Sequence, residues 1–196
     1  MICKFEELYQ QEAASQRPRY QALREGFAKQ FGSDAGGEYF SAPGRTEVGG
    51  NHTDHNHGRV LAAAVNLDAA AYARKTENGI AVLKSAEYPK LDMVDLNDLS
   101  VHPEEEGTSA ALLRGVCARC KELGYKIGGF EAFTMTRVLK GSGLSSSAAF
   151  EVLIVTILSH LYNDGQIDPV TAAKIAQYAE NVYSVSYTHL TLPTTP

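Results

Sequence analysis

Residues 141 to 149 read Gly-Ser-Gly-Leu-Ser-Ser-Ser-Ala-Ala and stand between a strand-like segment at 130–139 and an apolar run at 150–161. This order predicts a strand, a glycine–serine loop and a helix N-terminus. Such a junction gathers backbone N–H groups that lack partners at the positive end of a helix dipole, which suits a phosphate group. Gly141 and Gly143 permit positive φ and a close approach of the backbone. The stretch therefore predicts a phosphate-binding loop.

The loop differs from the two most familiar phosphate loops. No Gly-Lys-Ser/Thr closes it, as a Walker A motif requires, and Ser146 occupies the third glycine position of the dinucleotide fingerprint. The plain alternative is a strand-to-helix turn with a serine cap, because Ser is a preferred N-cap residue. Three consecutive serines favour phosphate, since the hydroxyls of Ser145, Ser146 and Ser147 could meet phosphate oxygens or a metal ion.

Composition narrows the class of protein. The chain has 196 residues and a formal net charge of −5, so no basic field attracts nucleic acid or an anionic membrane. We see no secretory signal, and the run at 150–161 is too short to span a bilayer, which predicts a cytoplasmic protein. Cys117 and Cys120 fit a helical apolar pattern and are interpreted as core residues, with a redox pair as the alternative.

Periodicity and turn residues predict the surrounding elements. Helices are expected at 19–31, with Pro18 at the start and Gly32 at the end, at 109–123, and from Asp168 to about Tyr183. Strands are expected at 38–42, 59–67, 69–76, 80–85 and 91–96. Asn78-Gly79 predicts a hairpin between the 69–76 and 80–85 strands. The mixture indicates an α+β protein.

A second polar motif lies at residues 44–58, which hold three histidines, two asparagines, one aspartate and four glycines. Such a segment buries no apolar surface, so core packing does not explain it. It could bind a metal ion through His52, Asp54, His55 and His57. It could equally bind a sugar, because carboxylates, amides and imidazoles pair with hydroxyls. A solvated glycine-rich turn is the third interpretation.

The two motifs together favour one chemistry. A sugar-binding segment combined with a phosphate loop makes a sugar kinase the simplest interpretation. A metal-dependent hydrolase built on His52, Asp54, His55 and His57 would leave the glycine–serine loop without a role.

At this point the residues resemble a known family. Gly44 to Asn56 resembles the galactokinase signature, and Gly141 to Ala149 resembles the phosphate loop of the GHMP kinase superfamily. The resemblance runs from about residue 20 to Tyr183. It implies the GHMP kinase N-terminal domain, an α+β fold related to ribosomal protein S5 domain 2, with a mixed sheet and packed helices.

The resemblance also implies the reaction and the site. ATP would give its γ-phosphate to the C1 hydroxyl of galactose, forming galactose 1-phosphate, with a monomer expected for the full-length protein. Arg45 would stabilise the transferring phosphoryl group, and Ser147 and Glu180 would bind Mg²⁺. The expected galactose contacts are Asn51, His52 and Asp54, and the expected ATP phosphate cradle is Gly141, Ser142, Gly143, Leu144, Ser145, Ser146 and Ser147. A galactose- and ATP-binding sensor without catalysis is the main alternative.

Two departures from the family pattern stand out. Asn51 occupies a position where most members carry Glu, which changes a hydrogen-bonding group without removing it. After Tyr183 the family continues to a Met-Asp-Gln-like motif that holds the catalytic Asp, whereas residues 184–196 here read Ser-Val-Ser-Tyr-Thr-His-Leu-Thr-Leu-Pro-Thr-Thr-Pro. We therefore expect 1–183 to be the N-terminal domain and 184–196 a non-native tail. Without the C-terminal domain, this chain is expected to be inactive alone.

Overall fold

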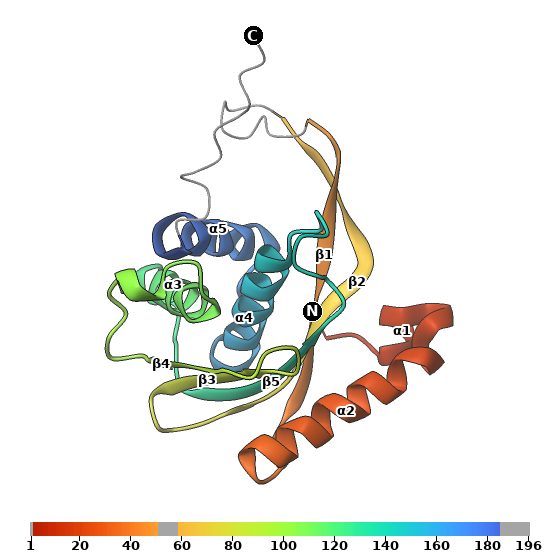
Figure 1. Ribbon diagram of the computed structural model, residues 1–196, viewed down its shortest axis with the longest axis horizontal. Coiled ribbons are helices and arrows are strands. Elements are labelled where there is room, and N and C mark those ends of the chain that lie inside the picture. The colour runs from red at the N-terminus through yellow and green to blue at the C-terminus, as the bar shows by residue number, and fades with distance from the viewer. Residues whose placement is uncertain (1, 51–58, 185–196) are drawn as a thin grey trace.

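The computed structural model describes residues 2–50 and 59–184, which form one mixed five-stranded sheet with helices on both faces (Figure 1). The strands are β1 (Glu38–Gly49), β2 (Leu61–Lys75), β3 (Ile80–Ser85), β4 (Leu91–Asp95) and β5 (Phe130–Thr136). The helices are α1 (Phe5–Tyr9), α2 (Ala13–Phe31), α3 (Ser109–Glu122), α4 (Ser146–Asn163) and α5 (Pro169–Ala179). Short turns of helix occupy Gln10–Glu12, Pro103–Glu105 and Glu180–Ser184. The predicted α+β class with a mixed sheet is confirmed.

The sheet order is β1-β2-β5-β3-β4, and only the β3–β5 pair is parallel. The predicted hairpin between 69–76 and 80–85 is therefore wrong, because β5 lies between β2 and β3. The backbone N–H of Thr76 donates to the carbonyl of Gly129, at 2.7 Å, so the chain before Asn78 already pairs with the segment that enters β5. The predicted strands at 59–67 and 69–76 are a single long strand, β2.

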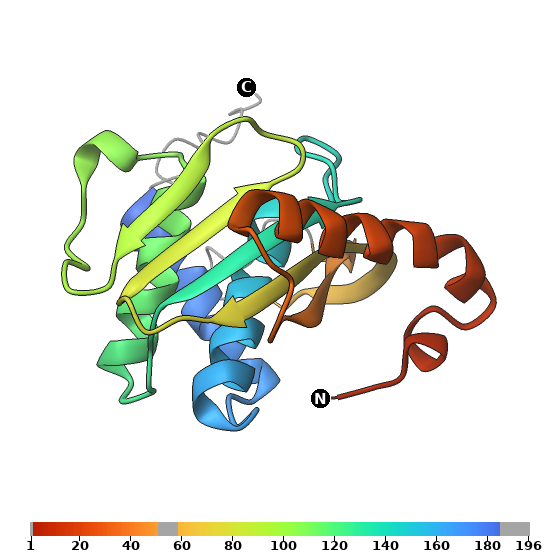
Figure 2. The same cartoon turned by 90° about the horizontal axis from the view of Figure 1, so that it is seen from below.

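Helices cover both faces of the sheet, with α3, α4 and α5 on one face and α1 and α2 on the other (Figures 1 and 2). Strand β2 shows how its sequence serves both layers. Ala69, Ala71 and Ala73 belong to the core beneath α4, whereas Ala70 and Tyr72 belong to the core beneath α2. Because successive strand residues point to opposite faces, an alanine-rich strand lets helices approach closely from both sides.

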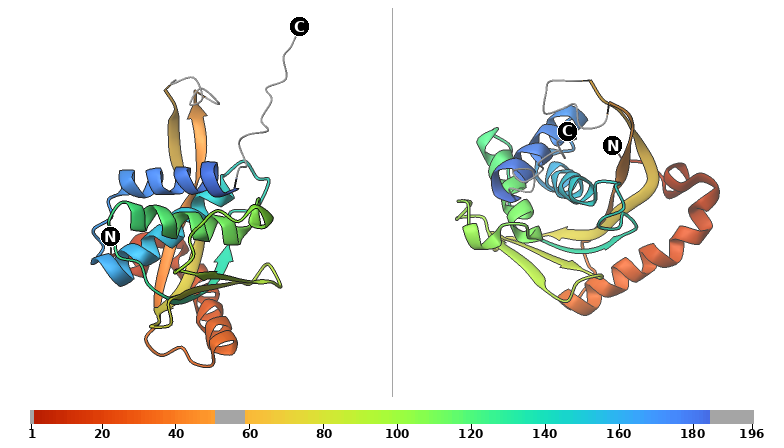
Figure 3. Two further views of the ribbon diagram at one scale, coloured as in Figure 1. Left: turned by 90° about the vertical axis from the view of Figure 1, so that its left-hand side faces the viewer. Right: turned by 45° about the horizontal axis from the view of Figure 1, so that its top comes forward.

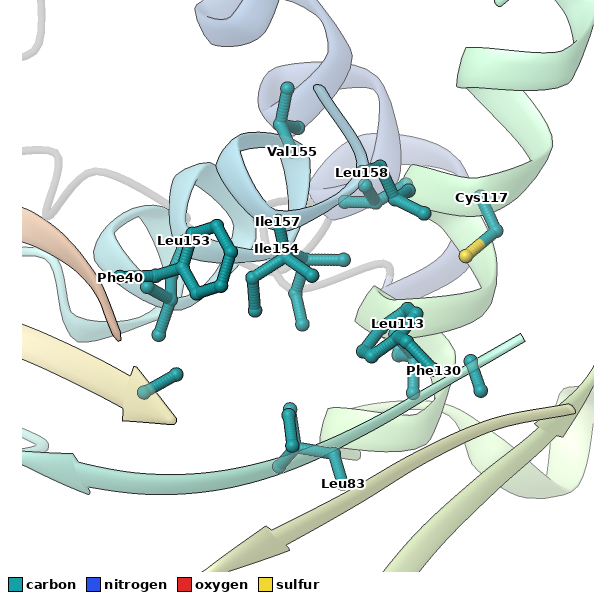
Figure 4. Close-up of a cluster of buried hydrophobic side chains, with 14 of the residues drawn as sticks. Phe40, Leu83, Leu113, Cys117, Phe130, Leu153, Ile154, Val155, Ile157 and Leu158 are labelled. Carbon is teal, nitrogen blue, oxygen red and sulfur yellow. The ribbon is translucent and has the colours of Figure 1, made fainter. Parts of the chain in front are cut away.

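The larger core lies between the sheet and α3, α4 and α5 (Figure 4). Its fully buried side chains include Leu83, Leu113, Phe130, Leu153, Ile154, Ile157 and Leu158. Cys117 and Cys120 are also fully buried there, which confirms their interpretation as core residues. Burial raises the pKa of Cys120 to about 12, so its thiol stays protonated and unreactive at neutral pH.

Helix α2 begins at Ala13, five residues earlier than Pro18 predicted, and ends before Gly32 (φ 80°) as expected. Proline inside a helix removes one backbone hydrogen bond. Ala13 and Gln16 are buried, so tertiary packing holds the extra turn despite that loss. The predicted helix start at Pro18 is therefore wrong, because the helix propensity of single residues stabilises less than the burial of side chains in the tertiary structure.

Strands β1 and β2 extend as a two-stranded ribbon beyond the helices (Figure 3). β1 therefore runs to Gly49, well past the predicted end at Ala42, and its register with β2 shifts between Pro43 and Arg45. The upper ribbon carries exposed Val48 and Leu61. Within the described part of the chain, every helix is too short or too polar to cross a lipid bilayer.

Candidate active site

The predicted phosphate loop connects the end of β5 at Thr136 to the start of α4 at Ser146, which confirms the expected strand, loop and helix. Gly141 (φ 80°), Gly143 (φ 75°) and Ser145 (φ 57°) all adopt the left-handed region. Glycine reaches this region without steric cost, whereas for Ser145 the conformation is strained. Such strain gathers at functional sites, so the Ser145 backbone marks the helix entrance as more than an ordinary turn.

The loop uses one of its own serines for internal bonding. Both the backbone N–H and the hydroxyl of Ser142 donate to the carbonyl of Leu139, at 3.2 and 2.6 Å. The Ser142 hydroxyl also accepts from the N–H of Leu144 at 3.4 Å. The hydroxyl and the backbone N–H of Ser142 therefore both shape the loop, and its predicted role as a phosphate contact stays a prediction.

The N-terminus of α4 presents donors without partners inside the helix. The first backbone bond of the helix runs from the N–H of Ala149 to the carbonyl of Ser145, at 3.0 Å. The N–H groups of Ser146, Ser147 and Ala148 precede it and have no acceptor within the helix. The Ser145 side chain makes no capping bond to them. This arrangement can bind an anion, because several N–H groups point out of the helix at its N-terminus, which is the positive end of the helix dipole.

Strand β1 brings Arg45 directly to this loop. The backbone N–H of Arg45 donates to the carbonyl of Leu144 at 3.1 Å, so two motifs almost one hundred residues apart share a backbone hydrogen bond. Gly44 permits the contact. A Cβ at Gly44 would lie 3.0 Å from the Val138 side chain and 3.1 Å from the Leu144 carbonyl.

The Arg45 side chain is partly exposed and points toward an acid that the sequence reasoning did not single out. Its Nη1 lies 2.8 Å from Oε1 of Glu47, two residues further along β1. Residues two apart on a strand share a face, which is the signal that could have found the pair. Glu47 can therefore hold the guanidinium of Arg45 until an anionic substrate competes for it.

Glu180 lies where α5 passes into a short π-helical turn, and the residue is 7% exposed. It faces Glu151 on α4, which is 1% exposed and whose Oε1 has no hydrogen-bond partner among the described residues. Ser147 and Glu151 are four residues apart and so share one face of α4. The fold thus brings Glu180 against the second turn of α4, one turn beyond Ser147.

Burial, and secondly the negative charge of Glu180, raise the pKa of Glu151 to about 9. Two carboxyl groups in one buried space cannot both ionise cheaply unless a cation joins them. An acid inside the apolar run of α4 is the sequence signal that could have found Glu151.

Several predicted site residues lie outside the described residues. They are Asn51, His52, Asp54, His55 and His57, together with the tail from 185 to 196. The galactose contacts, the histidine metal site and the foreign origin of the tail stay predictions. Among residues 2–50 and 59–184, no three His, Cys, Asp or Glu side chains cluster in a way that suits a metal ion.

Two family models match the chain. The galactokinase galactose-binding signature matches residues 25–75, and the N-terminal domain of the GHMP kinases matches residues 111–190. The first match contains Arg45, and the second contains the predicted phosphate loop and Glu180.

Proteins of similar sequence are galactokinases. A galactokinase of Clostridium tetani is 33% identical over 159 residues, covering 81% of this chain and 40% of the relative. A galactokinase of Streptococcus suis is 37% identical over 162 residues, covering 81% of this chain and 40% of the relative. The chain therefore spans about two fifths of the length of these relatives.

The fold also matches solved structures. The crystal structure of Lactococcus lactis galactokinase complexed with galactose is 32% identical, with a TM-score of 0.78, covering 84% of this chain and 42% of that chain. Mevalonate kinase of Methanococcus jannaschii matches with a TM-score of 0.62 at 19% identity, covering 75% of this chain and 47% of that chain. The second likeness shows the shared fold alone.

Proposed function

Because the chain belongs to the galactokinases of the GHMP kinase superfamily, we propose that the protein containing it transfers the γ-phosphate of ATP to the C1 hydroxyl of galactose. The galactose-binding signature at residues 25–75 supports the sugar, as does the galactose held by the Lactococcus lactis relative. The match to the GHMP kinase N-terminal domain supports ATP as the phosphoryl donor.

The backbone bond between Arg45 and Leu144 carries the proposal. It joins a strand that lies within the galactose-binding signature to the loop suited to phosphate. Phosphoryl transfer depends on holding donor and acceptor in line and on stabilising charge. A fold that joins the sugar segment to the phosphate loop would meet the first requirement, and the positive charge of Arg45, whose backbone bonds to the loop, would meet part of the second.

Each group then has a role in the proposed reaction. The N–H groups at the start of α4 and the loop backbone at 141–147 bind the ATP phosphates. Arg45 releases Glu47 and pairs with the transferring phosphoryl group. Asn51, His52 and Asp54 hold the galactose hydroxyls, where charge-assisted bonds contribute about 1.5–3 kcal/mol each.

Ser147 and Glu180 are the proposed holders of Mg²⁺. A hydroxyl and a carboxylate are hard oxygen donors of the kind this ion prefers, and the unpartnered Oε1 of Glu151 leaves a further buried acceptor beside them. When bound, the ion would neutralise charge on the phosphate oxygens.

The sugar assignment is tested by calorimetric titration of this chain with galactose and with Mg·ATP, and by galactose-dependent ADP release from the full-length protein. Asp54→Ala should weaken galactose binding by about tenfold or more, as expected for a lost charge-assisted bond, and leave ATP binding nearly unchanged. Equal loss of both ligands contradicts the role of Asp54. Binding of both ligands by the full-length protein without ADP release favours the sensor alternative.

The junction of the two motifs is tested by Gly44→Ala. The new methyl group would press on the Leu144 carbonyl and displace the loop, so Mg·ATP affinity should fall by about tenfold, with a loss of stability of about 1–3 kcal/mol. Gly49→Ala is the matched control on the same strand, because a Cβ there meets nothing within 4 Å. Equal ATP affinity in the two variants, measured by titration, would show that the contact between Gly44 and Leu144 does not contribute to ATP binding.

A further inference from the structure

A buried polar cluster lies on the far side of β2 from α4, and its centre is Asp68. The cluster, here called the Asp68 node, comprises Tyr9, Arg19, Ser41, Asp68 and Arg137. The Asp68 residue is 5% exposed and sits on an otherwise alanine-rich strand. A buried carboxylate is costly unless it is paired and hydrogen-bonded, so its partners show what the fold uses it for.

The Asp68 carboxylate is fully engaged. Its Oδ1 accepts from Nη1 of Arg19 at 2.7 Å, and its Oδ2 accepts from the hydroxyl of Ser41 at 2.7 Å and from the hydroxyl of Tyr9. Burial opposes ionisation, but the hydrogen bonds from Arg19, Ser41 and Tyr9 outweigh it and hold the pKa of Asp68 below its usual range. The side chain is therefore an anion at neutral pH that joins α1, α2 and β1.

The same residue holds the first residue of the phosphate loop. The backbone N–H of Arg137 donates to the carbonyl of Asp68 at 2.9 Å, and its Nη2 donates to the carbonyl of Asn66 at 2.7 Å. The Nε of Arg137 lies 3.4 Å from Oδ1 of Asp68, an ion-pair distance. Arg137 directly follows the end of β5 at Thr136, so these contacts fix where the loop leaves the sheet.

Asp68 also faces the irregularity that delivers Arg45 to the loop. It stands opposite Pro43 in the β1–β2 register, immediately before the register shift between Pro43 and Arg45. Ser41, which donates to Asp68, lies on β1 two residues before Pro43. Asp68 thus contacts both segments that meet at the bond between Arg45 and Leu144. Its carboxylate accepts from Ser41 on β1 and lies at ion-pair distance from Arg137, and its backbone carbonyl accepts from the N–H of Arg137 at the loop start.

We infer that Asp68 is a positioning residue that sets the phosphate loop against β1, through Arg137 on the loop side and Ser41 on the strand side. The inference rests on the proposed function only in that the loop binds ATP. Asp68 touches neither the loop tip nor Arg45, so its influence passes through the backbone that it holds. If the Asp68 side chain is made neutral, Arg19 and Arg137 lose their shared counter-ion. The backbone at the start of the loop then becomes more mobile.

The test compares two variants that each remove the carboxylate charge paired with an arginine that is at least partly buried. Asp68→Asn keeps the shape of the side chain and removes its charge. The control is Glu105→Gln. Glu105 pairs with buried Arg114 at 2.9 and 2.7 Å and ties the 98–105 segment to α3, outside the Asp68 node. Hydrogen–deuterium exchange is measured on peptides covering 137–145 and 109–122, and Mg·ATP affinity by titration.

Asp68→Asn should raise exchange in the 137–145 peptide by about tenfold and weaken Mg·ATP binding by a similar factor, whereas Glu105→Gln should leave both unchanged. Exchange that rises equally in both peptides, or not at all in 137–145, overturns the inference. If Asp68→Asn does not fold, Arg137→Met tests the loop side of the contact, since it removes the guanidinium that faces Asp68 and Asn66 and keeps the backbone bond to Asp68. A wild-type chain that fails to bind Mg·ATP contradicts the proposed function, while the exchange comparison still decides the role of Asp68.

Discussion

Glu151 is an acid on the most apolar helix of the molecule, almost completely buried and placed beside Glu180. Its folded-state pKa of about 9 exceeds the ordinary value of 4.5. The unfolded chain therefore releases this proton at a much lower pH than the folded chain does. Below pH 4.5 the carboxyl group is protonated in both states, so its ionisation does not affect stability. As pH rises toward 9, stability falls by about 1.4 kcal/mol per pH unit.

Glu151→Gln should remove this pH-dependent loss. Without metal, the variant should match wild type near pH 4.5 and exceed its melting temperature increasingly from pH 5 to pH 8. The measurement is thermal unfolding in EDTA across that range. Glu77→Gln is the control, because Glu77 is exposed. Parallel melting curves of wild type and Glu151→Gln at every pH would show that Glu151 ionises freely in the folded state.

The same residue illustrates a cost of function. Buried acids that lack partners are rare because they destabilise the fold. Glu151 lies one helical turn from Ser147 and against Glu180, the two proposed Mg²⁺ holders. The loss of stability caused by Glu151 is therefore consistent with a functional site in which buried oxygen atoms are positioned to bind a cation.

At the scale of elements, the contact between α3 and α5 places Glu180. Gly115 of α3 lies against α5, where a Cβ would approach the Cα and Cβ of Ala179 and the ring of Tyr183 at 2.9 Å each. Ala179 is the last residue of α5 and precedes Glu180. A glycine in mid-helix is unfavourable by about 1 kcal/mol, so its presence here follows from the close packing of two backbones.

Gly115→Ala should force α5 away from α3 and move Glu180. We expect a loss of about 1–3 kcal/mol of stability despite the better helix propensity of alanine, and a higher Mg²⁺ requirement for ATP binding. Denaturant unfolding and Mg²⁺-dependent titration measure the two effects. Lys121→Ala, at an exposed position of α3, is the control. A Gly115→Ala variant that is more stable than wild type would show that the space between α3 and α5 accommodates a methyl group.

The order of the strands in the sheet also depends on contacts between elements that are distant in the sequence. Asn78-Gly79 does form a turn, with Gly79 at φ 69°, yet the strands on either side of it do not pair. Phe130 and Ala132 of β5 are fully buried between them. Turn chemistry acts over a few residues and cannot exclude a strand that arrives fifty residues later and buries more apolar surface.

At the scale of the whole molecule, the sheet depends on helices over both faces. Helix α2 covers one face through Tyr20, Leu23 and Phe27, and Arg19 on the same helix binds Asp68. Burying each of these three apolar side chains contributes about 1.5–3 kcal/mol, which together rivals the net stability of a typical domain. The N-terminal helices therefore belong to the folding unit that holds the site.

Removal of residues 1–31 should abolish cooperative unfolding and increase binding of the dye ANS, since Ala70 and Tyr72 lose their cover. Circular dichroism during heating and dye fluorescence test this. Arg17→Ala is the control, because it removes an exposed ion pair with Glu6 and a surface cation–π contact with Phe5, and should change stability by about 1 kcal/mol or less. A shortened chain that still melts cooperatively would show that α4, α5 and the sheet suffice.

The amino-acid sequence by itself determined the features that act over short distances. The strand, glycine–serine loop and helix at 130–161, the buried α3 cysteines and the polar motif after Gly44 could all be predicted, because φ preferences, caps and apolar periodicity are local. The family followed from two motifs in order. Their functional contacts at 51–58 stay predictions.

Only the tertiary structure decided what depends on distant partners. It placed β5 between β2 and β3, joined Arg45 to Leu144, and buried Asp68 and Glu151. No local pattern shows whether an acid in an apolar segment meets arginines, as Asp68 does, or another acid, as Glu151 does. Burial makes that difference large in energy, because a charge removed from water depends on the groups that the fold brings to it.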